Sequence, residues 1–151
     1  MLKWQKLIIV IVALLDQFTK YLVRGNFNLY ESHPVFSFLS ITYVQNTGVA
    51  FGVLQHGKLS NIIFIIISVT IIAVIARYKN FFESHGKKGA MTGIPLVFGG
   101  AIGNLIDRVM LGSVVDFIDF HFFPVFNLAD SCITIGAVVL LLSVIFVRKL
   151  Q

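Results

Sequence analysis

Apolar residues run almost without interruption through three long stretches of the chain. Residues 59–76, 89–106 and 131–147 carry no charged side chain over 18, 18 and 17 positions. A helix needs about 20 residues of this kind to cross the roughly 30 Å of a bilayer's hydrocarbon core. The pattern therefore predicts three membrane-spanning helices.

A fourth apolar stretch, residues 7–23, is interrupted by Asp16 and Lys20. Its uninterrupted part, residues 7–15, has the length of a signal-peptide core, but no small-x-small cleavage site follows it. We therefore predict a retained first helix with a partly polar face. The expected fold class is an all-α membrane protein, with four transmembrane helices in a single integral membrane domain over residues 1–151.

The 35 residues from Arg24 to Lys58 are too many for a structureless connection. Residues 35–44 are aromatic and β-branched with broken alternation, which is typical of a strand. Asn46 to Gly48 then supplies a turn. We expect a small β-sheet over about residues 33–56 on the outer membrane surface, accompanied by a short outer helix or loop. Its apolar face would contact lipid headgroups or a lipid-linked ligand.

Composition supports a membrane protein and excludes other classes. Hydrophobic residues make up 57% of the chain, charged residues 13%, and the mean hydropathy is +0.89. Soluble domains average about 45–50% apolar and about 25% charged residues, and a disordered chain could not stay solvated with so few charges. The single cysteine, Cys132, excludes an internal disulfide framework and a cysteine-based zinc site.

The 12 lysines and arginines predict the orientation. Two precede the first predicted span, four lie between the second and third, and two follow the fourth, whereas only three lie in the other connections. The positive-inside rule therefore places both termini in the cytoplasm. The net charge of +5 is explained by this topology and needs no nucleic-acid partner.

Two aspartates at the outer boundary are the strongest candidates for chemistry. Asp116 lies inside Val114-Val-Asp-Phe-Ile118, where a carboxylate gains nothing unless it faces something polar. Asp130 begins the last apolar run and could form a capping box with Asn127. The hairpin between the third and fourth helices could bring both aspartates together.

Two carboxylates about 4 Å apart repel by about 4 kcal/mol at an effective dielectric near 20. That repulsion equals roughly three pKa units, so one of them would hold a proton at neutral pH. Asp116 is the better candidate for the proton, because Asp130 would lie at the positive end of a helix. Such a pair can activate water and protonate an amide without a covalent intermediate.

Other polar positions have structural or functional interpretations. Asp16 and Lys20 share one helix face and form either a self-satisfied pair or part of a site near the outer surface. The glycines of residues 99–103 allow a neighbouring backbone to approach closely. Asp107, at a helix C-terminus, needs a partner because it opposes the helix dipole, and Arg108 or another arginine could serve.

Competing chemistries have weaker support. The chain has no Gly-x-Ser-x-Gly motif, and its four histidines form no ligand-spaced motif. A metal held by Asp116, Asp119 and His121 is the less favoured alternative, and we expect neither metal nor cofactor. A small proton- or ion-coupled transporter is the alternative function, because carboxylates within membranes often mark ion paths. It is disfavoured because the acidic groups gather at one face and the sequence shows no inverted repeat.

Five motifs in order resemble those of the bacterial prolipoprotein signal peptidase family, signal peptidase II, and cover nearly the whole chain. The motifs are Asp16 to Lys20, Asn46 to Phe51, Gly99 to Arg108, Val114 to Ile118 and Phe126 to Asp130. The resemblance implies four transmembrane helices, a small outer β-structure and an aspartic endopeptidase. The enzyme would work at the outer face of the bacterial cytoplasmic membrane without a metal or organic cofactor.

The same resemblance implies the substrate and the site. Asp116 and Asp130 would form the catalytic dyad, which cleaves diacylglyceryl-modified prolipoproteins just before the lipidated cysteine. Expected partners are these substrates, membrane lipid and the cyclic-peptide inhibitor globomycin. The residues implied to bind substrate or support the site are Asp16, Lys20, Asn46, Gly48, Asn104, Asp107, Arg108 and Asn127.

Overall fold

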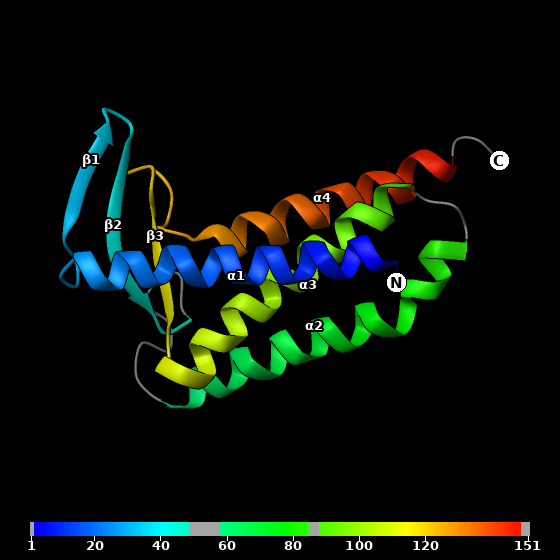
Figure 1. Cartoon of the computed structure of the whole chain (residues 1–151), viewed down its shortest axis with the longest axis horizontal. Helices are drawn as coiled ribbons and strands as arrows, with labels where there is room; N and C mark the ends of the chain where they lie inside the picture. The colour runs from blue at the N-terminus through cyan, green and yellow to red at the C-terminus, as the bar shows by residue number, and fades with distance from the viewer. Residues whose placement is uncertain (1, 49–57, 85–87, 149–151) are drawn as a thin grey trace.

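Four helices and a three-stranded sheet make up the parts of the chain that the computed structural model describes, residues 2–48, 58–84 and 88–148. The helices run alongside one another, the sheet lies across one end of them, and both termini lie at the opposite end (Figure 1). In chain order the elements are α1 (Lys3–Asn26), β1 (Ser32–Phe36), β2 (Leu39–Asn46), α2 (Lys58–Ser84), α3 (Lys88–Leu111), β3 (Val114–Asp119) and α4 (Leu128–Arg148).

Each predicted apolar span lies inside one of the four helices, and every helix extends beyond its span. Among the described residues, two helices are long and apolar enough to cross a membrane, over Leu59–Tyr78 with a mean hydropathy of 2.7 and Met91–Leu111 with 1.4. The apolar part of α4 among the described residues, Leu128–Ser143, is shorter. The helix containing Asp16 does not meet this criterion.

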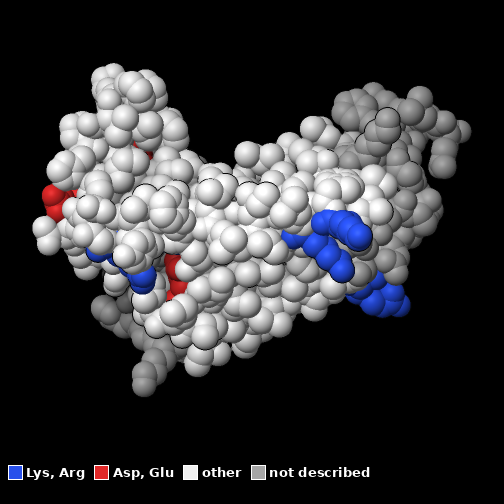
Figure 2. All heavy atoms as spheres, in the orientation of Figure 1, with Lys and Arg blue, Asp and Glu red and all other residues white. Residues whose placement is uncertain are grey.

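The outside of the helices is apolar and much of the inside is polar, the reverse of a soluble protein. Large side chains such as Leu14, Ile66 and Leu141 are exposed. On the face drawn in Figure 2, the visible acidic atoms lie in the half nearer the sheet, whereas basic atoms appear at both ends. An apolar exterior of this extent marks a surface that meets lipid rather than water.

Glycines on α3 allow close helix packing, as the sequence predicts. A Cβ added at Gly99 would lie 2.6 Å from the Cβ of Val12, and one added at Gly103 would collide with the Asp16 carboxylate. Helix α3 packs against each of the other three helices and occupies the centre of the bundle. The close approach of α1 and α3 brings polar groups from both helices into contact.

The sheet is antiparallel with strand order β1-β2-β3. The prediction of one strand over residues 35–44 is wrong, because Ser37 and Phe38 form the turn of a β1–β2 hairpin. The turn accounts for the broken alternation. Strand β3 was not predicted; Val115 and Phe117 from it pack into the small core of the sheet. Residues 49–56 of the predicted β region lie outside the described residues.

Candidate active site

Asp116 lies in β3, opposite Val44 of β2, and its side chain is buried, with 1% of the residue exposed. Asn46 Nδ2 donates to Asp116 Oδ2 at 2.8 Å, and Asn127 Nδ2 donates to Oδ1 at 2.7 Å. Each oxygen of this buried carboxyl therefore has an amide donor from a different element. The sheet positions the first donor, and the start of α4 positions the second.

Asp130 lies in the first turn of α4, where Asn127 is the N-cap. The Asp130 backbone N–H donates to Asn127 Oδ1 at 2.8 Å, and the Asn127 backbone N–H donates to Asp130 Oδ2 at 3.3 Å. These two bonds are the reciprocal capping box that the sequence predicts. Asn104 Nδ2 of α3 donates to the remaining oxygen, Asp130 Oδ1, at 2.7 Å.

The two aspartates meet at one site, because Asn127 bonds to both and also donates to Asn104 Oδ1 at 3.1 Å. Burial and the nearby charge of Asp130 raise the pKa of Asp116 to about 7, against the lowering effect of the hydrogen bonds from Asn46 and Asn127. A carboxyl with this pKa is about half protonated at neutral pH. The direction agrees with the sequence-based choice of Asp116 as the proton holder.

Three asparagine amides are oriented so that their NH₂ groups face the aspartates. Asn46 Oδ1 accepts from the Gly48 backbone N–H at 2.8 Å, Asn127 Oδ1 accepts from Asp130, and Asn104 Oδ1 accepts from Lys20 Nζ at 2.9 Å. An amide whose oxygen is held by a donor must direct its NH₂ group the other way. The site therefore surrounds its carboxyls with donors whose orientation is fixed.

Lys20 supports this arrangement from α1, and only 1% of it is exposed. Its ammonium group contacts Asp16 Oδ2 at 2.8 Å, Asp107 Oδ2 at 3.0 Å and Asn104 Oδ1 at 2.9 Å, which uses all three of its donors. The Asp16–Lys20 pair is therefore not self-contained. Through Lys20, the first helix is connected to the Asn104 amide, which donates to Asp130.

The two carboxylates that bind Lys20 also hold other elements in place. Asp107 Oδ2 accepts from the Val115 backbone N–H at 3.0 Å, next to Asp116. Asp16 Oδ1 accepts from the Ala129 backbone N–H at 2.9 Å, next to Asp130. One buried cation thereby ties both segments that carry the aspartates to the helix bundle.

Asp107 has a charged partner and a hydrogen-bonding partner, as its position predicts, but neither is the arginine that the sequence suggested. Lys20 is its charged partner, and Gln17 Nε2 donates to Asp107 Oδ1 at 2.9 Å, because α1 approaches α3 closely beside Gly103. Sequence reasoning missed Gln17, although its position beside Asp16 was a usable signal. Arg108 instead lies 5.2 Å from the ring centre of Phe64, where its charge still interacts with the aspartates.

Gly48 supports Asn46 at the end of β2. Its φ of +107° is unfavourable for residues with a side chain, and an added Cβ would collide with the Phe64 ring of α2. Glycine is therefore required both for the backbone conformation and for the close approach of α2. The residues that follow it, 49–51 of the predicted motif, lie outside the described residues.

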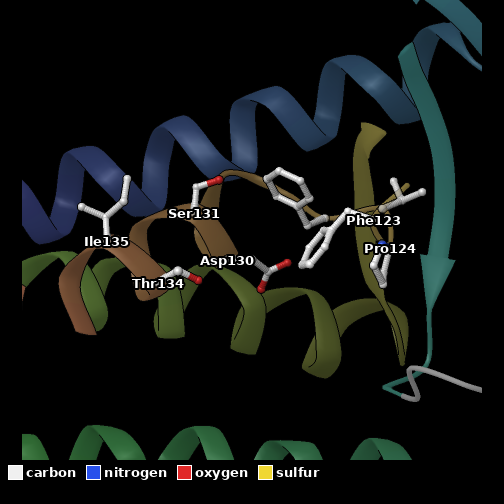
Figure 3. A pocket seen from close by; sticks show the side chains of 8 residues that line it. Phe123, Pro124, Asp130, Ser131, Thr134 and Ile135 are labelled. Atoms are coloured by element: carbon white, nitrogen blue, oxygen red, sulfur yellow. The ribbon is translucent and has the colours of Figure 1, made fainter. Parts of the chain in front are cut away.

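A cavity of about 500 Å³ adjoins Asp130, between the segment after β3 and the first turns of α4 (Figure 3). Apart from Asp130, the residues that line this cavity were not assigned to the site from the sequence; the aromatic run from Phe120 to Phe126 was the available signal. The lining residues are Phe123, Pro124, Val125, Phe126, Asp130, Ser131, Thr134 and Ile135.

The geometry favours proton transfer. Within residues 2–48, 58–84 and 88–148, no group of three or more His, Cys, Asp or Glu side chains could hold a metal ion. Asp119, part of the weaker metal alternative, accepts from Thr42 Oγ1 and from the His121 backbone N–H, both at 2.8 Å. The paired carboxyls can instead activate water and donate a proton to an amide substrate.

The chain is similar in sequence and in structure to known proteins. The sequence model of the family described as Signal peptidase (SPase) II matches residues 8–146. A lipoprotein signal peptidase from Caldanaerobacter subterraneus subsp. tengcongensis is 46% identical over 141 residues, which cover 92% of this chain and 94% of that protein. Its counterpart from Halothermothrix orenii is 42% identical over 137 residues, covering 90% and 91%. A solved bacterial membrane enzyme has a TM-score of 0.85 and 35% identity, covering 97% of this chain and 90% of that one.

Proposed function

The chain belongs to the signal peptidase II family, membrane aspartic peptidases that remove signal peptides from prolipoproteins, and on this premise we propose that Asp116 and Asp130 are its catalytic dyad. The observation that carries the proposal is the junction at Asn127, which hydrogen-bonds to both aspartates. The raised pKa of Asp116, about 7, supports a pair that holds one proton between them.

The proposed reaction is direct attack by water. Ionised Asp130 removes a proton from water as the water oxygen attacks the scissile carbonyl carbon. At the same time, protonated Asp116 donates its proton to the carbonyl oxygen. When the tetrahedral intermediate collapses, the C–N bond breaks and Asp130 gives its proton to the leaving nitrogen, while one hydroxyl of the intermediate returns a proton to Asp116. The products are a carboxylic acid and an amine, and the dyad again holds one proton.

The remaining predicted site residues have supporting roles in this proposal. Asn46, Asn104 and Asn127 orient the two carboxyls, and Arg108 supplies positive charge close to them. Gly48 holds the Asn46 amide. Asp16, Lys20 and Asp107 anchor the segments that carry the dyad.

We further propose the finer details of substrate and inhibitor. The substrate carries a diacylglyceryl group on the cysteine that follows the scissile bond, and membrane lipid surrounds the enzyme. Globomycin, as a cyclic-peptide inhibitor, would bind at the dyad. The names of the relatives, lipoprotein signal peptidases, support this substrate class and give the transporter alternative no support.

The proposed topology is a single multi-pass domain in the bacterial cytoplasmic membrane, with both termini in the cytoplasm and the active site at the outer face. Both termini lie at the end opposite the sheet (Figure 1). Lys3 and Lys6, near the start of α1, are exposed. The positive-inside rule supports placing that end in the cytoplasm. The sheet and the dyad then lie at the outer boundary of the membrane.

Incubation of the purified protein in detergent with two matched precursor peptides tests this function. One peptide carries diacylglyceryl on its cysteine, and the other carries an unmodified cysteine. We expect cleavage of the modified peptide just before the cysteine, detected by mass spectrometry. Equal cutting of both peptides, or no cutting of either, would contradict the proposed substrate class.

A further inference from the structure

The apolar cavity beside Asp130 has two different walls (Figure 3). Residues 123–126, which follow β3, form the aromatic wall. Ser131, Thr134 and Ile135, on the first two turns of α4, form the other. The Asp130 carboxylate belongs to the same lining, so a group held in the cavity would lie next to the proposed dyad.

The aromatic wall is held in place by ring and backbone contacts. Phe126 lies edge-to-face with Phe123 and stacks on Phe120, with ring centres 5.9 Å apart in both pairs. Its backbone N–H donates to Ile118 O at 3.1 Å, and the Ile118 N–H donates to Phe126 O at 2.8 Å. Phe120 stacks in turn on Phe38 of the hairpin turn. The sheet therefore supports the wall before any ligand arrives.

The helical wall continues into the lipid-facing surface of α4. Ile135 is 56% exposed, and Val138 and Leu142, three and seven positions further on, are 50% and 45% exposed. Residues at this spacing share one helix face. An apolar path thus runs from the Asp130 carboxylate along α4 towards the region that faces the hydrocarbon of the bilayer.

We propose that this cavity binds an acyl chain of the substrate's diacylglyceryl group and makes the enzyme selective for chain length, with Thr134 and Ile135 as determinants. This inference rests on the proposed function. The scissile bond lies directly before the lipid-bearing cysteine, so the acyl chains must leave the substrate close to the dyad. The cavity connects the proposed dyad to the lipid-facing surface of α4 by an apolar route.

The chemistry of the walls favours an acyl chain over a peptide segment. A buried peptide brings N–H and C=O groups that each need a hydrogen-bond partner, whereas an acyl chain needs none. The lining includes two hydroxyl-bearing residues, Ser131 and Thr134, among its apolar groups, and Ser131 Oγ already donates to Asn127 O at 3.1 Å. The walls therefore offer contact area rather than backbone pairing.

Cleavage rates with a series of acyl lengths test the proposal. Peptides identical except for the length of their diacylglyceryl chains are compared as monomers in dilute detergent. For the wild type, kcat/KM should rise about fourfold per added methylene until the cavity is filled, because burial of each methylene is favourable. The increase in kcat/KM should come mainly from a fall in KM, with little change in kcat.

Thr134→Phe, which fills the cavity, should lower kcat/KM for long-chain peptides more than for short-chain ones and so flatten this dependence. Thr70→Phe is the matched control, because Thr70 is exposed on α2 and does not line the cavity. Ile135→Ala, which enlarges the cavity, should move the optimum to longer chains and covers the case in which Thr134→Phe does not fold.

An unchanged chain-length dependence in both folded cavity variants would overturn the proposal. An equal flattening of the chain-length dependence by Thr70→Phe would also overturn it, because that result would indicate general partitioning into detergent or lipid. Either result leaves the proposed function intact, since the peptides are still cleaved. Failure of the wild type to cleave any lipidated peptide refutes the proposed function instead.

Discussion

The hydrogen bond from Asn46 to Asp116 should set the pH range of the enzyme. Asn46 Nδ2 lies 2.8 Å from Asp116 Oδ2, and this bond favours the ionised carboxylate. Burial nevertheless raises the pKa of Asp116 to about 7. Replacement of Asn46 with leucine removes the donor, so the pKa of Asp116 should rise further.

The size of the shift follows from the strength of the lost bond. A hydrogen bond to a charged group contributes about 1.5–3 kcal/mol, and one pKa unit corresponds to about 1.4 kcal/mol. Asn46 is only half-buried, which favours the lower value because water can replace part of the bond. We therefore expect the Asp116 pKa to rise by about one unit in Asn46→Leu.

The assay is the pH dependence of kcat/KM for a diacylglyceryl-modified peptide, from about pH 5 to about pH 9. The dyad works with one proton, so activity should fall as rising pH removes that proton from Asp116. The alkaline limb should move from about pH 7 in the wild type to about pH 8 in Asn46→Leu. Gln45→Leu is the control, since the Gln45 amide donates to Tyr43 Oη. An alkaline limb that stays in place or moves to lower pH would refute the reasoning.

Two further predictions concern the support of the site. Lys20→Met leaves two buried carboxylates without their cation and should destabilise the fold by about 3–5 kcal/mol, measured by thermal unfolding in detergent. Lys6→Met, at an exposed lysine, should have little effect on stability, and an equal loss of stability in both variants would contradict the role of Lys20. Gly48→Ala should lower kcat/KM and stability more than Gly112→Ala, because both have positive φ but only an added Cβ at Gly48 would collide with Phe64; equal effects would show that the close approach is unimportant.

Local sequence patterns predicted the helices and the capping box well. Long apolar runs suffice for helices in a membrane protein, and the spacing of Asn127 and Asp130 suffices for a cap. The hairpin turn at Ser37 and Phe38 escaped prediction because it contains neither glycine, proline nor asparagine. Strand β3 escaped prediction because it is short and because Asp116 interrupts the apolar pattern of its β-branched and aromatic residues.

Long-range contacts could not be read from local spacing. The partner of Asp107 is Lys20, which is 87 positions away and reaches it because Gly103 lets α1 approach α3. The orientation of the Asn104 amide depends on the same packing. The cavity is likewise formed only when the aromatic run after β3 folds back over α4.

The most direct test of the dyad compares three aspartate-to-asparagine variants in one cleavage assay. Asp116→Asn and Asp130→Asn should insert into the membrane at normal levels but lose cleavage of the lipidated precursor, because neither remaining carboxyl can both activate water and return a proton. Asp119→Asn, three residues along the same strand and hydrogen-bonded to Thr42, should retain cleavage. Near-normal turnover by Asp116→Asn or Asp130→Asn would contradict the account.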